Sequence, residues 1–459
     1  MLTNLNWLNA GQTFPPPTES KRLEKYRTNS MLFDNMQSTV WQEDYALLAR
    51  KLGKTDIDVR TVLNYHKLLS VKIADFVCSE PPTIETEQDT DKLLRLLERD
   101  DWCGKLYEAV IDISRYGNAV FKFVGKSLST VSPQFWFPVV DECDLKRITQ
   151  HVIAYPVCPN DKGVFTQLYV EIHSVGAVET RRYMLDKGTV LGSEITDERK
   201  TERTALKAFA VQPLTNVTHS GDIYGIDDYG AINSIVCDII WRLYCIDRVL
   251  DKHSEPTLSG PQSALSYDEN KKSYKILMGK FFTRNTAEEP DIKYITWDGN
   301  LDAAFKELEQ LFQQLYIISE MGQAFAIGKD GGGESSGTAL KIRLVSPRVK
   351  AARIANLNMS CVKRIIALFA ELNSIKIDYD TLVLHFNDGL PIDENEQIQT
   401  LSTATGGKAV MSQYAALKRM GRTDAQVEEE LEQIADEAAA ASPVVLTSVD
   451  KAGEADDGE

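Results

Sequence analysis

The sequence predicts an α+β fold that is mainly helical, and three observations support this prediction. Long segments with apolar residues at a 3.6-residue period occur in both halves of the chain. Short segments rich in β-branched and aromatic residues, separated by Pro, Gly and Asp, occur between residues 119 and 184. A glycine-rich loop within residues 321–343 separates two of the helical segments, and its glycines allow positive φ angles. With 459 residues, the chain has room for two to four domains.

The composition is typical of a soluble globular protein, with 43% hydrophobic and 26% charged residues. The net charge of -16 argues against a protein that grips nucleic acid through phosphate contacts. It is compatible with an acidic wall that DNA passes without adhering. The seven cysteines are scattered without a CxxC pair, and the six histidines are never at ligand spacing. We therefore expect a reducing compartment and no metal site, and the sequence also predicts no signal peptide and no membrane span.

In the first half, residues 1–20 are expected to form a loose arm, and residues 20–52 short helices. Residues 56–78 and 93–117 are each predicted to form one helix, the second capped by Gly117. The β-rich segments predict a small, mostly antiparallel sheet with a hairpin turn at 174–177. Its strands are predicted at 119–124, 135–137, 152–157, 168–173 and 180–184.

In the middle of the chain, two apolar stripes predict long helices at 229–252 and 301–320. Asp227 or Asp228 can cap the first helix, and Pro256 is expected to close it. Residues 257–300 predict a compact α/β excursion, so the two helices form a hairpin stalk with a head. Part of each stripe could face a neighbouring copy of the chain.

A further long helix is predicted from residue 338 to 372, with a kink or break at Pro347. Its many cations, including Lys350 and Arg353, are expected to lie on a solvated face. Residues 375–386 predict a strand, and the polar region after Asp388 predicts two helices with a break at Gly406 and Gly407. The acidic residues from Ser442 onward are expected to be disordered.

The glycine-rich loop raises the possibility of phosphate binding, but its residues depart from a P-loop. Gly332 and Gly337 have the required spacing, whereas Thr338 occupies the position of the essential lysine, and no strand-like segment precedes the loop. A mobile surface loop is the simpler interpretation, with Ser335 or Ser336 capping the next helix. No catalytic motif is found, so the sequence predicts no catalytic residue, no cofactor and no enzyme activity.

The order of these parts resembles the portal (connector) proteins of tailed double-stranded DNA phages, in particular the long-tailed, siphophage-like branch. The resemblance covers almost the whole chain except the extreme N-terminus and the acidic tail. Five stretches carry it: residues 62–84, 113–123, 222–233, 335–343 and 391–396, the third reading DIYGIDDYGAIN and the fourth SSGTALKIR.

The resemblance implies a ring of about a dozen subunits that forms the DNA channel at one capsid vertex. It assigns residues 1–228 to a wing, 229–252 to stem helix 1, 253–300 to a clip, and 301–320 to stem helix 2. It also assigns residues 321–337 to the tunnel-loop region, 338–395 to the rest of the wing, and 396–459 to the crown and acidic tail. Such a ring serves genome packaging, head-tail joining and DNA ejection, and it resides in the virion after assembly in the host cytoplasm.

The resemblance also implies the residues of the channel and the partners of the ring. The tunnel-loop residues would be Gly328, Lys329, Asp330, Gly331, Gly332, Gly333, Glu334, Ser335, Ser336, Gly337 and Lys341, with the two lysines nearest the DNA phosphates. The implied partners are further copies of the chain, double-stranded DNA, the terminase large subunit, a head-tail adaptor, and the major capsid and scaffolding proteins. Two other functions stay open from the residues alone: a ring or scaffold protein without a channel, and an enzyme that binds phosphate through the loop.

Overall fold

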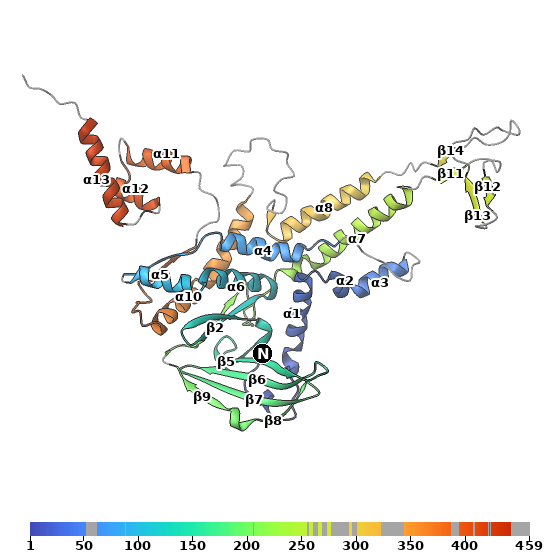
Figure 1. Cartoon of the computed structure of the whole chain (residues 1–459), viewed down its shortest axis with the longest axis horizontal. Helices are drawn as coiled ribbons and strands as arrows, with labels where there is room; N and C mark the ends of the chain where they lie inside the picture. Colours follow the sequence, from blue (N-terminus) through green and yellow to red (C-terminus); the bar gives the residue numbers. More distant parts are fainter. Residues whose placement is uncertain are drawn as a thin grey trace, which may run out of the picture. The chain divides into compact units, whose positions relative to one another are not determined.

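The structure is a computed structural model (Figure 1), and it divides into two compact units, Met1–Gly389 and Leu390–Glu459. It describes residues 1–51, 62–87, 89–204, 206–254, 257–259, 265–268, 273–276, 293–295, 301–322, 344–386, 394–406, 409–420, 422 and 424–441. The described part contains both helices and sheets, which confirms the predicted α+β class. No described helix is long and apolar enough to cross a membrane.

The first helices are α1 (Ser20–Phe33), α2 (Gln37–Val40), α3 (Gln42–Lys51) and α4 (Tyr65–Val77). The short helices predicted within 20–52 are confirmed. The prediction of one helix over 56–78 is wrong at residues 62–64, which are not helical, and α4 begins only after Asn64. Residues 56–61 lie outside the described residues. The Asn64 side chain accepts a hydrogen bond from the Lys67 amide, and this cap fixes the start of the helix.

The single helix predicted at 93–117 is in fact two helices, α5 (Thr90–Arg99) and α6 (Trp102–Tyr116). Asp101 separates them with a left-handed backbone (φ +52°), which a regular helix cannot contain. The predicted cap at Gly117 is confirmed, since this residue has a φ of +82° and its amide bonds to the Ile113 carbonyl.

Two antiparallel sheets follow, where the sequence predicted one. The smaller has the order β10-β2-β3, formed by Val211–Thr215, Asn118–Val124 and Ser127–Val131. The larger runs β4-β5-β6-β7-β8, formed by Trp136–Val140, Ile148–Pro159, Phe165–Ser174, Ala177–Asp186 and Val190–Glu194, and β9 (Lys200–Arg203) also pairs with β7. The hairpin turn at 174–177 is confirmed, with Ser174 paired to Ala177.

The predicted loose arm at the start of the chain is instead part of the core. Trp7 and Phe14 are buried against Phe137 on one face of the larger sheet, with ring centroids 5.4 and 5.7 Å from the Phe137 ring. Trp136, which precedes Phe137 in β4, points to the opposite face and packs with Val120 and Val211 of the smaller sheet. The apolar side chains of the arm therefore cover a sheet face that would otherwise lie open to water.

The two long helices of the middle region are confirmed as α7 (Tyr229–Ser254) and α8 (Asp302–Ile318), which pack against each other (Figure 1). Between them, the described segments are four short strands in two antiparallel pairs. The strand β11 (Thr257–Ser259) pairs with β14 (Lys293–Ile295), and β12 (Leu265–Asp268) pairs with β13 (Ser273–Ile276).

The predicted break at Pro347 is wrong, because α10 (Val345–Leu372) runs without interruption. Pro347 lies in the first turn of α10, where an amide has no partner within the helix, so the missing N–H costs nothing. The helix joins the sheet layer through Asn358, whose side chain bonds to both the amide and the carbonyl of Thr215 at 2.8 and 2.9 Å.

The strand predicted at 375–386 is limited to β15 (Val383–His385), which pairs antiparallel with β1 (Thr83–Glu85). In the described residues of the second unit, three helices replace the predicted two: α11 (Glu394–Thr405), α12 (Gln413–Arg419) and α13 (Asp424–Ala441). The end of α11 at Thr405 agrees with the predicted break at Gly406, and Ser412 starts α12 by accepting a bond from the Ala415 amide. The additional boundary lies between the end of α12 at Arg419 and the start of α13 at Asp424.

Candidate functional site

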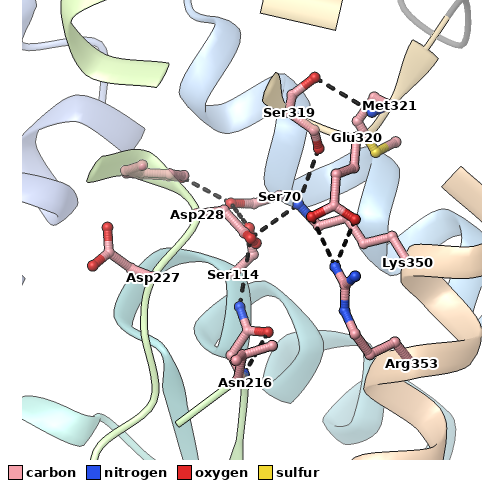
Figure 2. A network of polar contacts seen from close by, with 12 residues as sticks. Ser70, Ser114, Asn216, Asp227, Asp228, Ser319, Glu320, Met321, Lys350 and Arg353 are labelled. Atoms are coloured by element: carbon pink, nitrogen blue, oxygen red, sulfur yellow. Dashed lines mark hydrogen bonds and ion pairs between the residues drawn. The ribbon is translucent and has the colours of Figure 1, made fainter. Parts of the chain in front are cut away.

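Every predicted tunnel-loop residue, from Gly328 to Gly337 together with Lys341, lies outside the described residues. The structure does describe the residues that hold the two ends of this segment, where α8 ends and α10 begins. We call this group the loop root, and we define it as Asp228, Ser319, Glu320, Met321, Lys350 and Arg353 (Figure 2).

The chain leaves α8 through a tight turn that side chains stabilise. Glu320 adopts a left-handed backbone with a φ of +59°, which a residue with a side chain rarely does. The next residue, Met321, is fully buried, and its amide donates to the Ser319 hydroxyl at 3.4 Å. The direction in which the chain leaves α8 is therefore fixed before the loop begins.

The first turns of α10 bind this turn from the other side. Arg353 Nη2 donates to both carboxylate oxygens of Glu320, at 2.9 and 2.7 Å. The Ser346 hydroxyl donates to the Glu320 carbonyl at 3.0 Å. Glu320, whose backbone conformation is strained, is therefore hydrogen-bonded to α10 through both its side chain and its carbonyl.

Lys350 lies at the centre of the loop root, and only 3% of its surface is exposed. Its Nζ donates to the Ser319 carbonyl at 3.0 Å and forms an ion pair with Asp228 Oδ1 at 2.9 Å (Figure 2). The Ser319 carbonyl belongs to the C-terminal end of α8, where the helix dipole favours a cation. The sequence prediction of a solvated face is wrong for Lys350, because this stretch of α10 packs against other helices.

The start of α7 supplies the acidic partner of Lys350. Asp227 caps the helix by accepting a bond from the Gly230 amide at 2.9 Å, which confirms one of the two predicted caps. Asp228 is thereby free to face Lys350, and its own amide donates to the Ser114 carbonyl of α6 at 2.9 Å. The next residue, Tyr229, shares a 2.8 Å hydrogen bond with Ser70 of α4. The loop root is therefore anchored to α4 and α6 as well as to α7.

Two of the stretches that carry the portal resemblance cross at the approach to α7. A Cβ added at Gly225 would lie 1.9 Å from the Gly117 carbonyl oxygen, and one added at Gly117 would lie 2.1 Å from the Gly225 oxygen. The Asn118 side chain accepts a hydrogen bond from the Gly225 amide at 3.0 Å. Only glycine fits at both positions of the crossing, which sets the path of the chain toward Asp228.

The histidine nearest the start of α7 is His66, which is fully buried. Its ring lies 5.0 Å from the Tyr229 ring and 6.0 Å from the Trp41 ring. Burial lowers the pKa of His66 to about 4, because the charged imidazolium would lose its hydration. Nearby on α6, burial raises the pKa of Asp112 to about 6, although the ion pair with Arg115 at 2.7 Å opposes this rise.

The chemistry of the loop root is structural. Lys350 and Asp228 bind each other, and Arg353 binds Glu320, so these charges are engaged within the protein. Among the residues that the structure describes, no group of three or more His, Cys, Asp or Glu side chains could hold a metal ion. The sequence did not reveal the site, since the pairs join residues far apart in the chain and Lys350 looks like any cation of an amphipathic helix.

Part of the chain that includes most of the loop root is similar to a known protein family. The model of the family described as "Phage portal protein, SPP1 Gp6-like" matches residues 238–444. This range includes most of α7, all of α8 and α10, and the segment between them. No curated protein sequence matches the chain.

Three solved structures of a gene transfer agent (GTA) particle show a weak similarity. The neck of the native particle computed with C12 symmetry has a TM-score of 0.48 at 12% identity, covering 91% of this chain and 97% of that one. The virion of the native particle gives 0.47 at 12% identity, with 90% and 96% covered. The neck of the empty particle computed with C6 symmetry gives 0.47 at 11% identity, with 78% and 90% covered.

TM-scores below 0.5 are too low to establish a shared fold. The relationship to a known family is therefore supported by the family match. Its range includes most of α7, all of α8, and two of the five stretches that carry the sequence resemblance, residues 335–343 and 391–396. The match therefore confirms the predicted resemblance, since residues 238–444 of this chain are similar to phage portal proteins of the SPP1 Gp6-like family.

Proposed function

We propose that this chain is the subunit of a phage portal, a ring that forms the DNA channel at one capsid vertex. The family match over residues 238–444 is the observation that carries the proposal. The ring would admit the genome during packaging, join head to tail, and release the DNA on ejection. It would consist of about a dozen copies of the chain, since a heterologous interface that closes on itself generates a ring.

The exposed apolar side chains of the paired helices support contact with further copies. On α8, Ile317 is 67% exposed and Phe305 is 51% exposed, while Leu315 is fully buried against its own subunit. On α7, Leu250 is 52% exposed. Apolar side chains left in water on two neighbouring helices are typical of a surface that another protein covers.

In this proposal, α7 and α8 are the stem helices and residues 321–337 form the tunnel-loop region. Gly328 to Gly337 and Lys341 would then lie beside the DNA, and residues 253–300 would form the clip that contacts the terminase large subunit and the head-tail adaptor. The remaining regions would be the wing (1–228 and 338–395) and the crown with its tail (396–459), near the capsid and scaffolding proteins. The chain would hydrolyse nothing itself, and ATP turnover would belong to the terminase.

Electron microscopy of the purified full-length chain tests the ring. We expect closed particles with an axial hole and one dominant subunit number. A population of monomers or compact dimers across a range of concentrations would contradict the proposal. In that case, a nucleotide titration with micromolar affinity would instead support an enzyme that binds phosphate through the glycine-rich loop.

A deletion of Gly331–Gly333 separates a DNA channel from a ring or scaffold without one. We expect rings and capsids that still form but fail to package or retain DNA, because the shortened loop cannot follow the moving duplex. Particles that package a full genome with this deletion would contradict the assignment of the tunnel loop.

A further inference from the structure

We infer that Lys350 is a positioning residue, which fixes both ends of the proposed tunnel loop to the first turn of α7. This inference rests on the proposed function for its biological meaning, but its structural content can be tested separately. The buried ammonium group of Lys350 connects α7, α8 and α10 where the loop begins and ends.

The geometry gives Lys350 this role because its two partners come from different helices. Its backbone belongs to the second turn of α10, just after the loop ends. Its Nζ reaches the Ser319 carbonyl at the end of α8, at 3.0 Å, and Asp228 at the start of α7, at 2.9 Å. The two ends of the loop and the start of α7 therefore meet at one atom (Figure 2).

Burial makes this contact strong. Lys350 is 3% exposed, so its ammonium depends on protein partners for the hydration it has lost. The Arg353–Glu320 pair beside it is about 40% exposed on both sides, and water weakens such a pair. Removing Lys350 would leave the Asp228 carboxylate with only a 3.5 Å hydrogen bond from the Asn216 side chain. The Ser319 carbonyl would lose the lysine that binds it, which favours separation of α8 from α10.

The neighbouring pair of Lys25 and Asp227 provides a matched control. Asp227 is the residue before Asp228, and Lys25 of α1 forms an ion pair with it. Half of the Lys25 side chain is exposed, and the pair involves neither α8 nor α10. A substitution of Lys25 therefore removes a lysine partner from the same turn of α7 without affecting the ends of the loop.

Amide hydrogen exchange of the full-length chain, measured by mass spectrometry, tests the inference directly. In Lys350→Met, we expect exchange in residues 319–322 and 344–348 to rise by about tenfold or more, since the loss of a buried ion-pair partner opens the adjacent structure. In Lys25→Met, exchange in these residues should stay at the wild-type rate. Wild-type rates in Lys350→Met would overturn the inference.

The double variant Asp228→Asn with Lys350→Met distinguishes positioning from simple charge neutralisation. It removes the uncompensated carboxylate, so it should fold even if Lys350→Met does not. The Ser319 carbonyl still lacks its partner, and we expect fast exchange at both ends of the loop to persist. If the double variant restores the wild-type rates, Lys350 only neutralises Asp228 and the inference fails.

Particles carrying these variants test the consequence for function. We expect the double variant to form rings as the wild type does, yet to package less DNA per particle, since a loosened root no longer holds the loop in place. Normal packaging combined with fast exchange would contradict the positioning role in translocation. Failure of the wild-type chain itself to form rings would instead contradict the proposed function and leave the exchange result intact.

Discussion

At the scale of single residues, the path of the chain toward α7 depends on two glycines, which have no side chain. Gly117 and Gly225 lie so close that neither has room for a Cβ, and Gly117 also has a left-handed backbone. Both glycines belong to stretches that support the portal resemblance. Their role in the structure is to let two chain segments cross, after which Asp228 meets Lys350.

Gly225→Ala is expected to lower the free energy of unfolding by about 3 kcal/mol, because the new Cβ forces two backbone segments apart. Thermal unfolding of the full-length chain measures this as a lower melting temperature. Gly221→Ala is the matched control, since a Cβ at Gly221 has no atom within 4 Å. Equal stability of the two variants would show that the crossing is not tight in solution.

His66 gives a prediction for the pH dependence of stability. Its pKa is about 4 in the folded chain, against an ordinary value of 6.5, so below pH 6.5 the unfolded chain takes up the proton first. Stability is therefore lost as the pH falls from 6.5 to 4, by about 3 kcal/mol from this residue. Buried His151, whose pKa is lowered to about 3, adds a second loss that also begins near pH 6.5 and continues down to about pH 3.

His66→Gln should reduce this loss of stability, because glutamine does not take up a proton. The unfolding free energy of the variant then has no pH-dependent contribution from position 66. Denaturant unfolding at pH 7, 5.5 and 4.5 measures the slope. His219→Gln is the control, since His219 is exposed, and it should keep the wild-type slope. A wild-type slope in His66→Gln would mean that another group dominates the acid sensitivity.

At the scale of elements, the sequence predicted those whose signal is periodic and long. The stripes of α7 and α8 are visible as apolar positions, and all four ends of these helices lie within two residues of the predicted ends. The predictions were wrong where a single residue determines the start, the end or the continuity of a helix. Asn64 delays α4, Asp101 divides α5 from α6, and Pro347 fits in a first turn instead of breaking a helix. Such local choices do not change the apolar pattern, so periodicity could not reveal them.

The loop root could not be predicted for a different reason. Its bonds join residues that only the folded chain brings together, such as Lys350 with Asp228 and Arg353 with Glu320. Each of these residues has an ordinary place in its own segment, as a cation or an acid of a helix. The sequence therefore indicated the loop, and only the structure showed what holds it.

The contrast between buried and exposed positions on α8 gives a prediction at this scale. Leu315→Ala should lower the free energy of unfolding by about 3 kcal/mol, because Leu315 is fully buried and its loss leaves a cavity. Ile317→Ala should change it by less than about 0.5 kcal/mol, since Ile317 is 67% exposed in the subunit. Chemical denaturation of both variants provides the comparison, and a large loss in Ile317→Ala would show that the helix is covered within its own subunit.

At the scale of the whole molecule, the charge of -16 has a consequence for DNA. Phosphate contacts supply nonspecific affinity, and an acidic wall opposes them. We expect the purified chain to bind a short duplex more weakly than about 10 µM at about 150 mM salt. Fluorescence anisotropy measures this, and a nanomolar affinity at the same salt would be incompatible with a smooth passage of DNA.

The pairing of β1 with β15 has a consequence for synthesis. The ribosome must add residues 86–382 after β1 before the strand that completes its sheet exists. At about 5–20 residues per second, this takes roughly 15 to 60 s. A nascent chain therefore waits with one strand edge unfilled, and a prematurely terminated polypeptide never fills it. A polypeptide that stops before Val383 therefore leaves β1 without the strand that pairs with it.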